Sequence, residues 1–165
     1  MTTPLAYLRN RASEADIAAH LRRCDEAFVP ALGTRVDIDD YAQKLASRSV
    51  RFEAWHDELV GLLAVYCNDE ARQLAFITSI SVLPHWRRRG IASHLLHDCV
   101  RYLRQGGFAQ VQLEVDARNA AAVAMYARHG FAAVGHRDAS AADHGRDATH
   151  VDATTMVLTL EASVE

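Results

Sequence analysis

The stretch LAFITSISVLPHWRRRGIASHLLHDCVRYL, residues 74–103, decides the fold that we expect for this chain. Its apolar run from Leu74 to Leu83 predicts a strand, and Pro84 ends that strand because proline cannot donate to a β-ladder. Apolar residues then recur at helical spacing from Ile91 to Leu103. The stretch therefore predicts a strand and a helix joined by a short basic loop that contains a glycine.

The loop Arg87-Arg88-Arg89-Gly90-Ile91-Ala92 is suited to hold an anion. The first N–H groups of a helix have no partner within it, and the aligned peptide dipoles favour negative charge there, so a helix start is a phosphate site. Gly90 would let a phosphate approach the backbone closely. Taken alone, the hexapeptide fits a solvated basic turn or a weak nucleic-acid patch equally well.

The composition indicates a globular protein. The chain has 165 residues, half of them hydrophobic and 24% charged, which suits a single domain spanning residues 1–165. The 18 Lys and Arg against 21 Asp and Glu give a formal charge of −3, which argues against a general nucleic-acid binder. No apolar run approaches the ~20 residues of a membrane span, and residues 1–11 do not resemble a signal peptide. We expect a cytoplasmic protein with no nucleic-acid or membrane partner.

The cysteines and histidines predict neither disulfides nor a metal site. Cys24, Cys67 and Cys99 are odd in number and widely spaced, as is typical of reduced thiols in the cytosol. The nine histidines are scattered, and only His94 and His97 share one turn of a predicted helix. Zinc needs further ligands close by, so a solvated helix face is the better interpretation of that pair.

The remaining elements follow from capping, spacing and turn signals. Ser13-Glu14-Ala15-Asp16 resembles a capping box before one helix, and Asp37 can cap a second. The strands on either side of the central helix should pair in parallel within a mixed, largely antiparallel sheet. The predicted strands are Arg51–Trp55, Leu59–Cys67, Leu74–Leu83, Phe108–Val115, Phe131–His136 and Thr154–Glu161, and a helix runs from the Asn119 cap to His129.

Two segments of the chain resemble the GNAT acetyltransferase superfamily. The acyl-CoA-binding signature of this superfamily is [RQ]-x-x-G-x-[GA], where x is any residue. Arg87, Gly90 and Ala92 occupy its three defined positions. The second segment contains Leu113-Glu114-Val115, Asn119, Ala122, Tyr126 and Gly130-Phe131, and Met156 to Leu160 is also of the family type. The resemblance spans about Leu59 to Glu161. It implies an α/β (α+β) GNAT fold, with a mixed sheet of about six to seven strands flanked by about four helices.

The resemblance implies acetyl-CoA as the co-substrate, without a metal. Backbone N–H groups of the loop would hold the pyrophosphate, and the arginine side chains would add attraction. The pantetheine arm would pair with the main chain around Ile80 to Val82, like an extra strand, and Asn119 would reach the same arm. The predicted cofactor-binding residues are Ile80, Ser81, Val82, Arg87, Arg88, Arg89, Gly90, Ile91, Ala92, Ser93, Asn119 and Ala122.

Two residues are predicted to be catalytic. Tyr126 matches the residue that in many relatives protonates the departing CoA thiolate, and ordinary pKa values of about 10 for a phenol and about 8.5 for a thiol make that donation feasible but weakly driven. Glu114 is the candidate base for the incoming amine, with a purely structural role as the alternative. Ser79 and Ser81 lie where several relatives carry a glutamate, so a base acting through ordered water is also considered. A nucleophilic Cys67 or Cys99 is disfavoured, because neither has a paired base in the sequence.

The expected acceptor is a primary amine of a small molecule, which attacks the thioester directly. A protein N-terminus is the alternative, because Leu113 to Phe131 is similar to the ribosomal-protein acetyltransferases. A non-catalytic acyl-CoA sensor and a nucleic-acid module are further alternatives, and a homodimer is compatible with the sequence. Positional analogy alone suggests that Phe28, Tyr41, Asn68 and Asp69 face the acceptor. The polar final loop suits a cationic amine, and a mobile surface loop without a binding role is an equally good interpretation. The residues concerned in that loop are Asp138, Asp143, His144, Asp147, His150 and Asp152.

Overall fold

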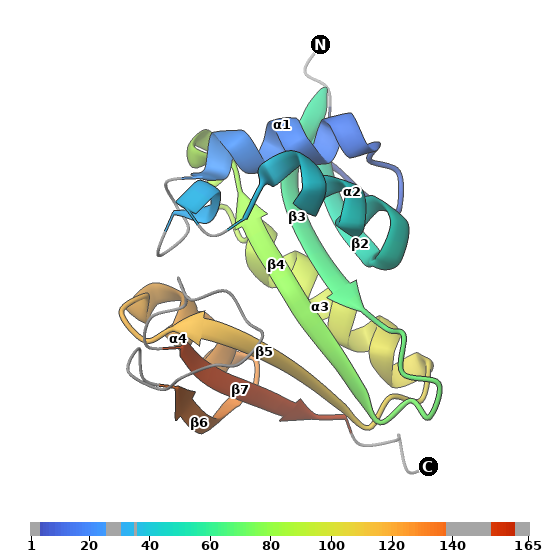
Figure 1. The fold of residues 1–165 in the computed structure, drawn as a ribbon, viewed down its shortest axis with the longest axis vertical. Coiled ribbons are helices and arrows are strands. Elements are labelled where there is room, and N and C mark those ends of the chain that lie inside the picture. Colours follow the sequence, from blue (N-terminus) through green and yellow to red (C-terminus); the bar gives the residue numbers. More distant parts are fainter. Residues whose placement is uncertain (1–3, 26–30, 35, 138–152, 161–165) are drawn as a thin grey trace.

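The computed structural model describes residues 4–25, 31–34, 36–137 and 153–160 (Figure 1). Seven strands form one sheet in the order β1-β2-β3-β4-β5-β7-β6. The strands are β1 (Ala6–Arg9), β2 (Val50–His56), β3 (Glu58–Tyr66), β4 (Leu74–Val82), β5 (Gln110–Asp116), β6 (Ala132–Arg137) and β7 (Ala153–Thr159). The α-helices are α1 (Glu14–Cys24), α2 (Ile38–Arg48), α3 (Ile91–Gln105) and α4 (Ala120–Arg128), with short 3-10 helices η2 (Leu32–Thr34) and η3 (Pro84–Trp86).

The predicted helix starts are confirmed by their caps. Ser13 and Asp16 exchange the two hydrogen bonds of a capping box at the start of α1. The Asp37 carboxylate accepts the N–H of Asp40 at the start of α2. Each cap satisfies an N–H group that would otherwise have no partner. The mixed sheet with helices on its faces is confirmed as well.

Strand β1 was not predicted from the sequence. It is a four-residue edge strand that pairs antiparallel with β2, with Tyr7 opposite Ala54. Four residues are too few to show an apolar alternation. The strand exists because β2 offers it an unpaired edge.

The sheet divides between β4 and β5. These strands pair in parallel only from Leu74 opposite Gln110 to Ile77 opposite Leu113. At that point the register of β4 with β3 shifts by one residue at Thr78, as in a β-bulge. Beyond the bulge the two strands diverge (Figure 1). Residues 78–82 of β4 therefore face β5 across a wedge.

Two hydrophobic cores cover the two faces of the sheet. Helices α1 and α2 lie on one face, over β2 and β3, and α3 lies on the other (Figure 1). The first core contains Ile17, Leu21, Leu45 and Leu62, and the second contains Leu63, Leu95, Leu96, Leu103, Val111 and Tyr126. The wedge between β4 and β5 is placed where these two cores meet.

Gly61 allows the start of α3 to approach the sheet. A Cβ atom at Gly61 would lie 2.7 Å from Cγ2 of Ile91 and 3.2 Å from Cβ of Ala54. Ile91 is the first residue of α3 and is 1% exposed, so its methyl group has no room to retreat. Glycine in β3 therefore sets the position of the helix start that the sequence marks as an anion site.

Gly61→Ala is expected to lower the free energy of unfolding by about 1–3 kcal/mol, as overpacked cores do. Gly135→Ala is the matched control, because a Cβ atom there meets nothing within 4 Å, and its effect should stay within about 0.5 kcal/mol. Urea unfolding of both variants measures the difference. Equal stabilities for the two variants would contradict the close approach at Gly61.

Candidate functional site

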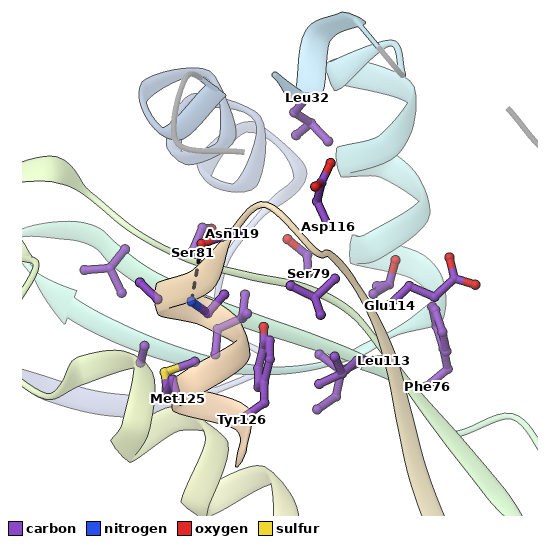
Figure 2. Close-up of a pocket in the computed structure, with 18 of the residues that line it drawn as sticks. Leu32, Phe76, Ser79, Ser81, Leu113, Glu114, Asp116, Asn119, Met125 and Tyr126 are labelled. Atoms are coloured by element: carbon purple, nitrogen blue, oxygen red, sulfur yellow. Dashed lines mark hydrogen bonds between the residues drawn. The ribbon is translucent and has the colours of Figure 1, made fainter. Parts of the chain in front are cut away.

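A cavity of about 500 Å³ occupies the wedge between β4 and β5 (Figure 2). Its walls come from both cores. Val82, Leu113 and Tyr126 belong to the core under α3, whereas Leu32 belongs to the core under α1 and α2. The cavity therefore connects the two faces of the sheet at the point where the strands separate. Its lining residues include Leu32, Val36, Tyr41, Phe76, Thr78, Ser79, Ile80, Ser81, Val82, Arg87, Ala92, Leu113, Glu114, Val115, Asp116, Asn119, Ala122, Met125 and Tyr126.

The start of α3 presents its N–H groups without a side-chain cap. The N-cap is Gly90, whose φ of 78° lies in the left-handed region that favours glycine. Within the described part of the chain, this helix has no side-chain cap that accepts a hydrogen bond from its first turn. The free N–H groups of the first turn and the positive end of the helix dipole are therefore available to an anion.

The three arginines of the loop differ in their contacts. Arg87 lines the cavity, and its Nε donates to the Val82 carbonyl at 3.1 Å, which ties the loop to the end of β4. Arg89 places its guanidinium 4.7 Å from the centre of the Trp86 ring. Arg88 has a φ of 63°. All three side chains are exposed, so the loop before α3 carries three positive charges at the surface.

The predicted cofactor-binding residues fall into two groups. Seven of them line the cavity: Ile80, Ser81, Val82, Arg87, Ala92, Asn119 and Ala122. The remaining five lie beside it, in the loop and the first turn of α3: Arg88, Arg89, Gly90, Ile91 and Ser93. Of these, Ile91 is buried in the core and Ser93 contacts the His129 ring at 3.2 Å. Any role for these two in anion binding would come from their backbone.

Tyr126 lies on α4 and points its hydroxyl into the cavity (Figure 2). The residue is 5% exposed, and its ring packs 5.8 Å from that of Phe131. Burial raises the pKa of the Tyr126 phenol well above its usual range, because the charged form loses its hydration. The hydroxyl is therefore protonated and can donate a hydrogen bond into the cavity.

Asn119 caps α4 at the edge of the cavity. Its Oδ1 accepts the N–H of Ala122 at 3.3 Å (Figure 2). This bond uses the acceptor end of the amide, and the NH₂ end is a donor with two hydrogens. The capping role and the predicted contact with a ligand are thus compatible.

Two carboxylates line the cavity from β5. Glu114 and Asp116 lie two residues apart and so face the same side of the sheet, opposite Leu113 and Val115. The Asp116 carboxylate, 4% exposed, accepts hydrogen bonds from Nε and Nη2 of Arg118 at 3.0 and 2.7 Å. The Glu114 carboxylate is directed away from Tyr126 (Figure 2). Glu114 is predicted from the sequence and Asp116 is not, although strand alternation places them on the same face.

Ser79 contributes a buried hydroxyl that lacks a partner among the described residues. It is 5% exposed, lines the cavity and follows the bulge in β4. A buried hydroxyl without a hydrogen bond is costly, so such a group usually meets water or a ligand. Next to it, Tyr41 on α2 donates to the Thr78 carbonyl at 3.1 Å, which fixes α2 against the bulge.

The predicted acceptor-facing residues are only partly placed in the cavity. Tyr41 lines it. Asn68 and Asp69 do not, because Asp69 accepts the N–H groups of Ala71, Gln73 and Leu74 and so organises the turn before β4. Phe28, Asp138, Asp143, His144, Asp147, His150 and Asp152 lie outside the described residues.

His20 lies beside the cavity although the sequence does not predict it as a site residue. It lies on α1, is 2% exposed, and contacts the Leu59 carbonyl through Nδ1 at 3.0 Å and the Ser81 hydroxyl through Nε2 at 2.9 Å. Burial is the main cause that lowers the pKa of His20 to about 4, so the ring is neutral at pH 7. The available signal was helical spacing, because His20 shares the buried face of Ile17 and Cys24.

The low pKa of His20 makes the stability of the protein depend on pH. In the unfolded chain a histidine has a pKa near 6.5. Between that pH and the pKa of about 4 in the folded protein, the imidazole is protonated in the unfolded state and neutral in the folded state. Stability contributed by neutral His20 is therefore lost as the pH falls. Between pH 7 and pH 5 this loss is about 2 kcal/mol.

Urea unfolding of the unmodified protein and of His20→Leu at both pH values tests this dependence. The stability difference between the two proteins should shrink by about 2 kcal/mol from pH 7 to pH 5. Parallel curves for the two proteins would mean that His20 titrates normally. The comparison cancels the contribution of other groups, including Arg23 and Glu58, whose charges act on His20 in opposite directions.

The thiols have the character of structural cysteines. Cys24 and Cys99 are buried and Cys67 is partly buried, all three as free thiols. Burial raises the pKa of Cys67 to about 11 and that of Cys99 well above its usual range. A nucleophilic cysteine needs a lowered pKa, so these shifts agree with the prediction against a cysteine nucleophile.

The described residues contain no group of three or more His, Cys, Asp or Glu side chains that could hold a metal ion. None of the helices in the described part of the chain combines the length and apolarity that crossing a membrane requires.

Comparison with known proteins identifies the family to which the sequence is similar. The model of the Acetyltransferase (GNAT) family matches residues 15–131. An uncharacterized N-acetyltransferase of Methanocaldococcus jannaschii is 37% identical over 76 residues, which cover 44% of this chain and 34% of that protein. The N-alpha-acetyltransferase MAK3 of Arabidopsis thaliana is 32% identical over 82 residues, covering 48% of this chain and 43% of that protein. Each match thus spans less than half of the relative's own length.

Solved structures share the fold over nearly the whole chain. A ribosomal-protein-alanine N-acetyltransferase from Brucella melitensis is 25% identical with a TM-score of 0.71, covering 93% of this chain and 99% of that one. The acetyltransferase yncA of Salmonella typhimurium, solved with acetyl-CoA, has a TM-score of 0.71 at 18% identity over 99% and 98% of the chains. A chimera of the Vibrio cholerae spermidine N-acetyltransferase SpeG and hSSAT has a TM-score of 0.72 at 18% identity over 94% and 95%.

Proposed function

Because the chain belongs to the GNAT acetyltransferase family, we propose that it is an acetyl-CoA-dependent N-acetyltransferase that moves an acetyl group to a primary amine by direct attack. The observation that carries this proposal is the cavity that joins the two faces of the sheet. One side of it meets the uncapped start of α3, and the other is lined by Glu114 and by the Asp116–Arg118 ion pair. A CoA donor and an amine acceptor can therefore enter from opposite faces.

The residues around the start of α3 fit the pyrophosphate of CoA. The uncapped N–H groups of the first helical turn supply donors, and Gly90 leaves the approach to them open, because a Cβ there would meet nothing within 4 Å. Residues 80–82 of β4 have no partner on β5, so their main chain can pair with the amides of the pantetheine arm. Acetyl-CoA supplies the activated acetyl group when it is bound.

Tyr126 is the proposed proton donor to the departing sulfur. Its protonated hydroxyl points into the cavity from α4 (Figure 2). Burial makes the tyrosinate costly, and it also makes an unsolvated thiolate costly, so a hydrogen bond from Tyr126 to the developing thiolate is favourable. As the amine nitrogen bonds to the acetyl carbon and the carbon–sulfur bond breaks, the sulfur takes up the Tyr126 proton. The tyrosinate, which burial disfavours, regains a proton from solvent before the next turnover.

The amine must lose a proton on the other side of the cavity. Glu114 remains the proposed base, although its carboxylate is directed away from Tyr126 (Figure 2). Ser79 supports the alternative of a base that acts through water, because its buried hydroxyl needs a partner that the described residues do not supply. Water held at Ser79 would pass the proton from the amine towards the carboxylates of β5.

A small molecule is the first choice for the amine. Leu32 and Val36 line the α1 and α2 side of the cavity with apolar side chains, and the cavity volume of about 500 Å³ is in the range of pockets that bind small molecules. A protein N-terminus is the second candidate. It is favoured by the similarity to the N-alpha-acetyltransferase MAK3 and to the ribosomal-protein-alanine N-acetyltransferase.

The acceptor class is tested by the rate of thiol release from acetyl-CoA in the presence of different amines. Amino sugars, amino acids and polyamines represent small acceptors, and short peptides with a free or a blocked N-terminus represent protein ones. We expect a small amine to give the highest kcat/KM. A higher kcat/KM for the peptide with a free N-terminus, and no activity with the blocked peptide, would identify a protein N-terminus as the acceptor.

A further inference from the structure

We propose that His20 is a positioning residue for the acceptor amine: it binds the hydroxyl proton of Ser81, so that Ser81 Oγ offers only lone pairs to an N–H group in the cavity. The inference rests on the proposed function, because it assumes that an amine enters from the α1 and α2 side. His20 itself is not a cavity-lining residue, and it acts through Ser81.

The hydrogen bonds of His20 determine which ring nitrogen carries the proton. Nδ1 lies 3.0 Å from the carbonyl oxygen of Leu59, which can only accept, so Nδ1 is the protonated nitrogen. In the neutral ring Nε2 is then an acceptor. Ser81 Oγ lies 2.9 Å from Nε2 and donates its single proton to it. The chain of bonds runs from Ser81 through His20 to the backbone of β3.

Burial protects this arrangement. His20 is 2% exposed, and Cys24, one turn further along α1, has its sulfur 3.6 Å from the same Nε2. The charged groups that act on the ring are Arg23 and Glu58, with opposite effects. The ring therefore stays neutral at the pH at which amines react, and Nε2 keeps its lone pair for the Ser81 hydroxyl.

Ser81 faces the amine side of the cavity. Its hydroxyl contacts α1, and it lies two residues from Ser79 on the same face of β4. The start of α3, where the donor would bind, is on the opposite face. A serine that can only accept selects an N–H donor, and an amine whose N–H is held there keeps its lone pair for the thioester carbon.

The test compares His20→Leu, Ser81→Ala and the double variant, with Cys24→Ala as the control that removes the thiol beside both Nε2 and the Ser81 hydroxyl. His20→Leu and Ser81→Ala should each raise the KM for the amine about 3- to 10-fold, which corresponds to the loss of one hydrogen bond. The Kd for acetyl-CoA should stay within about twofold. The KM for the amine should be the same in the double variant as in Ser81→Ala, because His20 acts on the amine only through Ser81.

Additive effects, an unchanged KM in His20→Leu, or an equal rise in the acetyl-CoA Kd would each overturn the proposal. Long-range ¹H–¹⁵N NMR of the imidazole in the 165-residue protein provides a readout that does not need activity. We expect Nδ1 protonated and Nε2 unprotonated at pH 7, with the Nε2 resonance shifted in Ser81→Ala. A proton on Nε2 would refute the arrangement. Unmodified protein that is inactive with every amine would instead reject the proposed function.

Discussion

Tyr126→Phe is expected to lower kcat for acetyl transfer by about 100-fold or more, the lower end of what a positioned proton donor contributes. The substitution removes one oxygen and leaves the ring packed beside Phe131. Because that hydroxyl interacts with sulfur only as the thiolate develops, the loss appears in kcat. The Kd for acetyl-CoA, measured by calorimetry, should change less than about twofold.

Tyr102→Phe is the matched control for this variant. Tyr102 lies on α3, packs edge-on against Phe52 and lies outside the cavity. Steady-state thiol release should show no more than a small change in kcat for the control. If Tyr126→Phe behaves like Tyr102→Phe while chemistry limits the rate, Tyr126 is not the proton donor.

Ala92→Asp is expected to weaken acetyl-CoA binding by about 100-fold or more while leaving the fold as stable as before or slightly more stable. Ala92 lines the cavity in the uncapped first turn of α3. A carboxylate there is favourable for the helix by about 0.3–1 kcal/mol, because it faces the positive end of the dipole. The same charge occupies the place proposed for the pyrophosphate and repels it.

Stability and affinity should thus move in opposite directions, which a simple loss of structure cannot produce. His97→Asp is the control, since it adds the same charge five residues further along α3, at an exposed position. Calorimetric titration with acetyl-CoA and urea unfolding measure both quantities. Unchanged affinity in Ala92→Asp would place the anion site elsewhere.

The features that the sequence predicted are those that depend on residues close together in the chain. The helix starts at Ser13, Asp37 and Asn119 are predicted because a cap acts on N–H groups two or three residues away. The loop before α3 is predictable for the same reason. Its glycine at a left-handed position and its uncapped helix start both follow from a short run of residues.

Residues whose role depends on a distant partner were not predicted. Gly61 is required by Ile91, 30 positions later, and His20 is paired with Ser81, 61 positions later. The missed strand β1 likewise depends on β2. Glu114 was identified by its pattern, but the direction of its carboxylate depends on how β5 separates from β4, and no local signal reports that separation.

The central claim is that the cavity between β4 and β5 transfers an acetyl group from CoA to an amine. The most direct test is to incubate the protein with acetyl-CoA and the preferred amine and to measure both products, released thiol by absorbance and acetylated amine by mass spectrometry. We predict equal amounts of the two, formed in proportion to time and to enzyme concentration. Binding of acetyl-CoA with neither product from any amine would contradict the claim and indicate a non-catalytic acyl-CoA sensor.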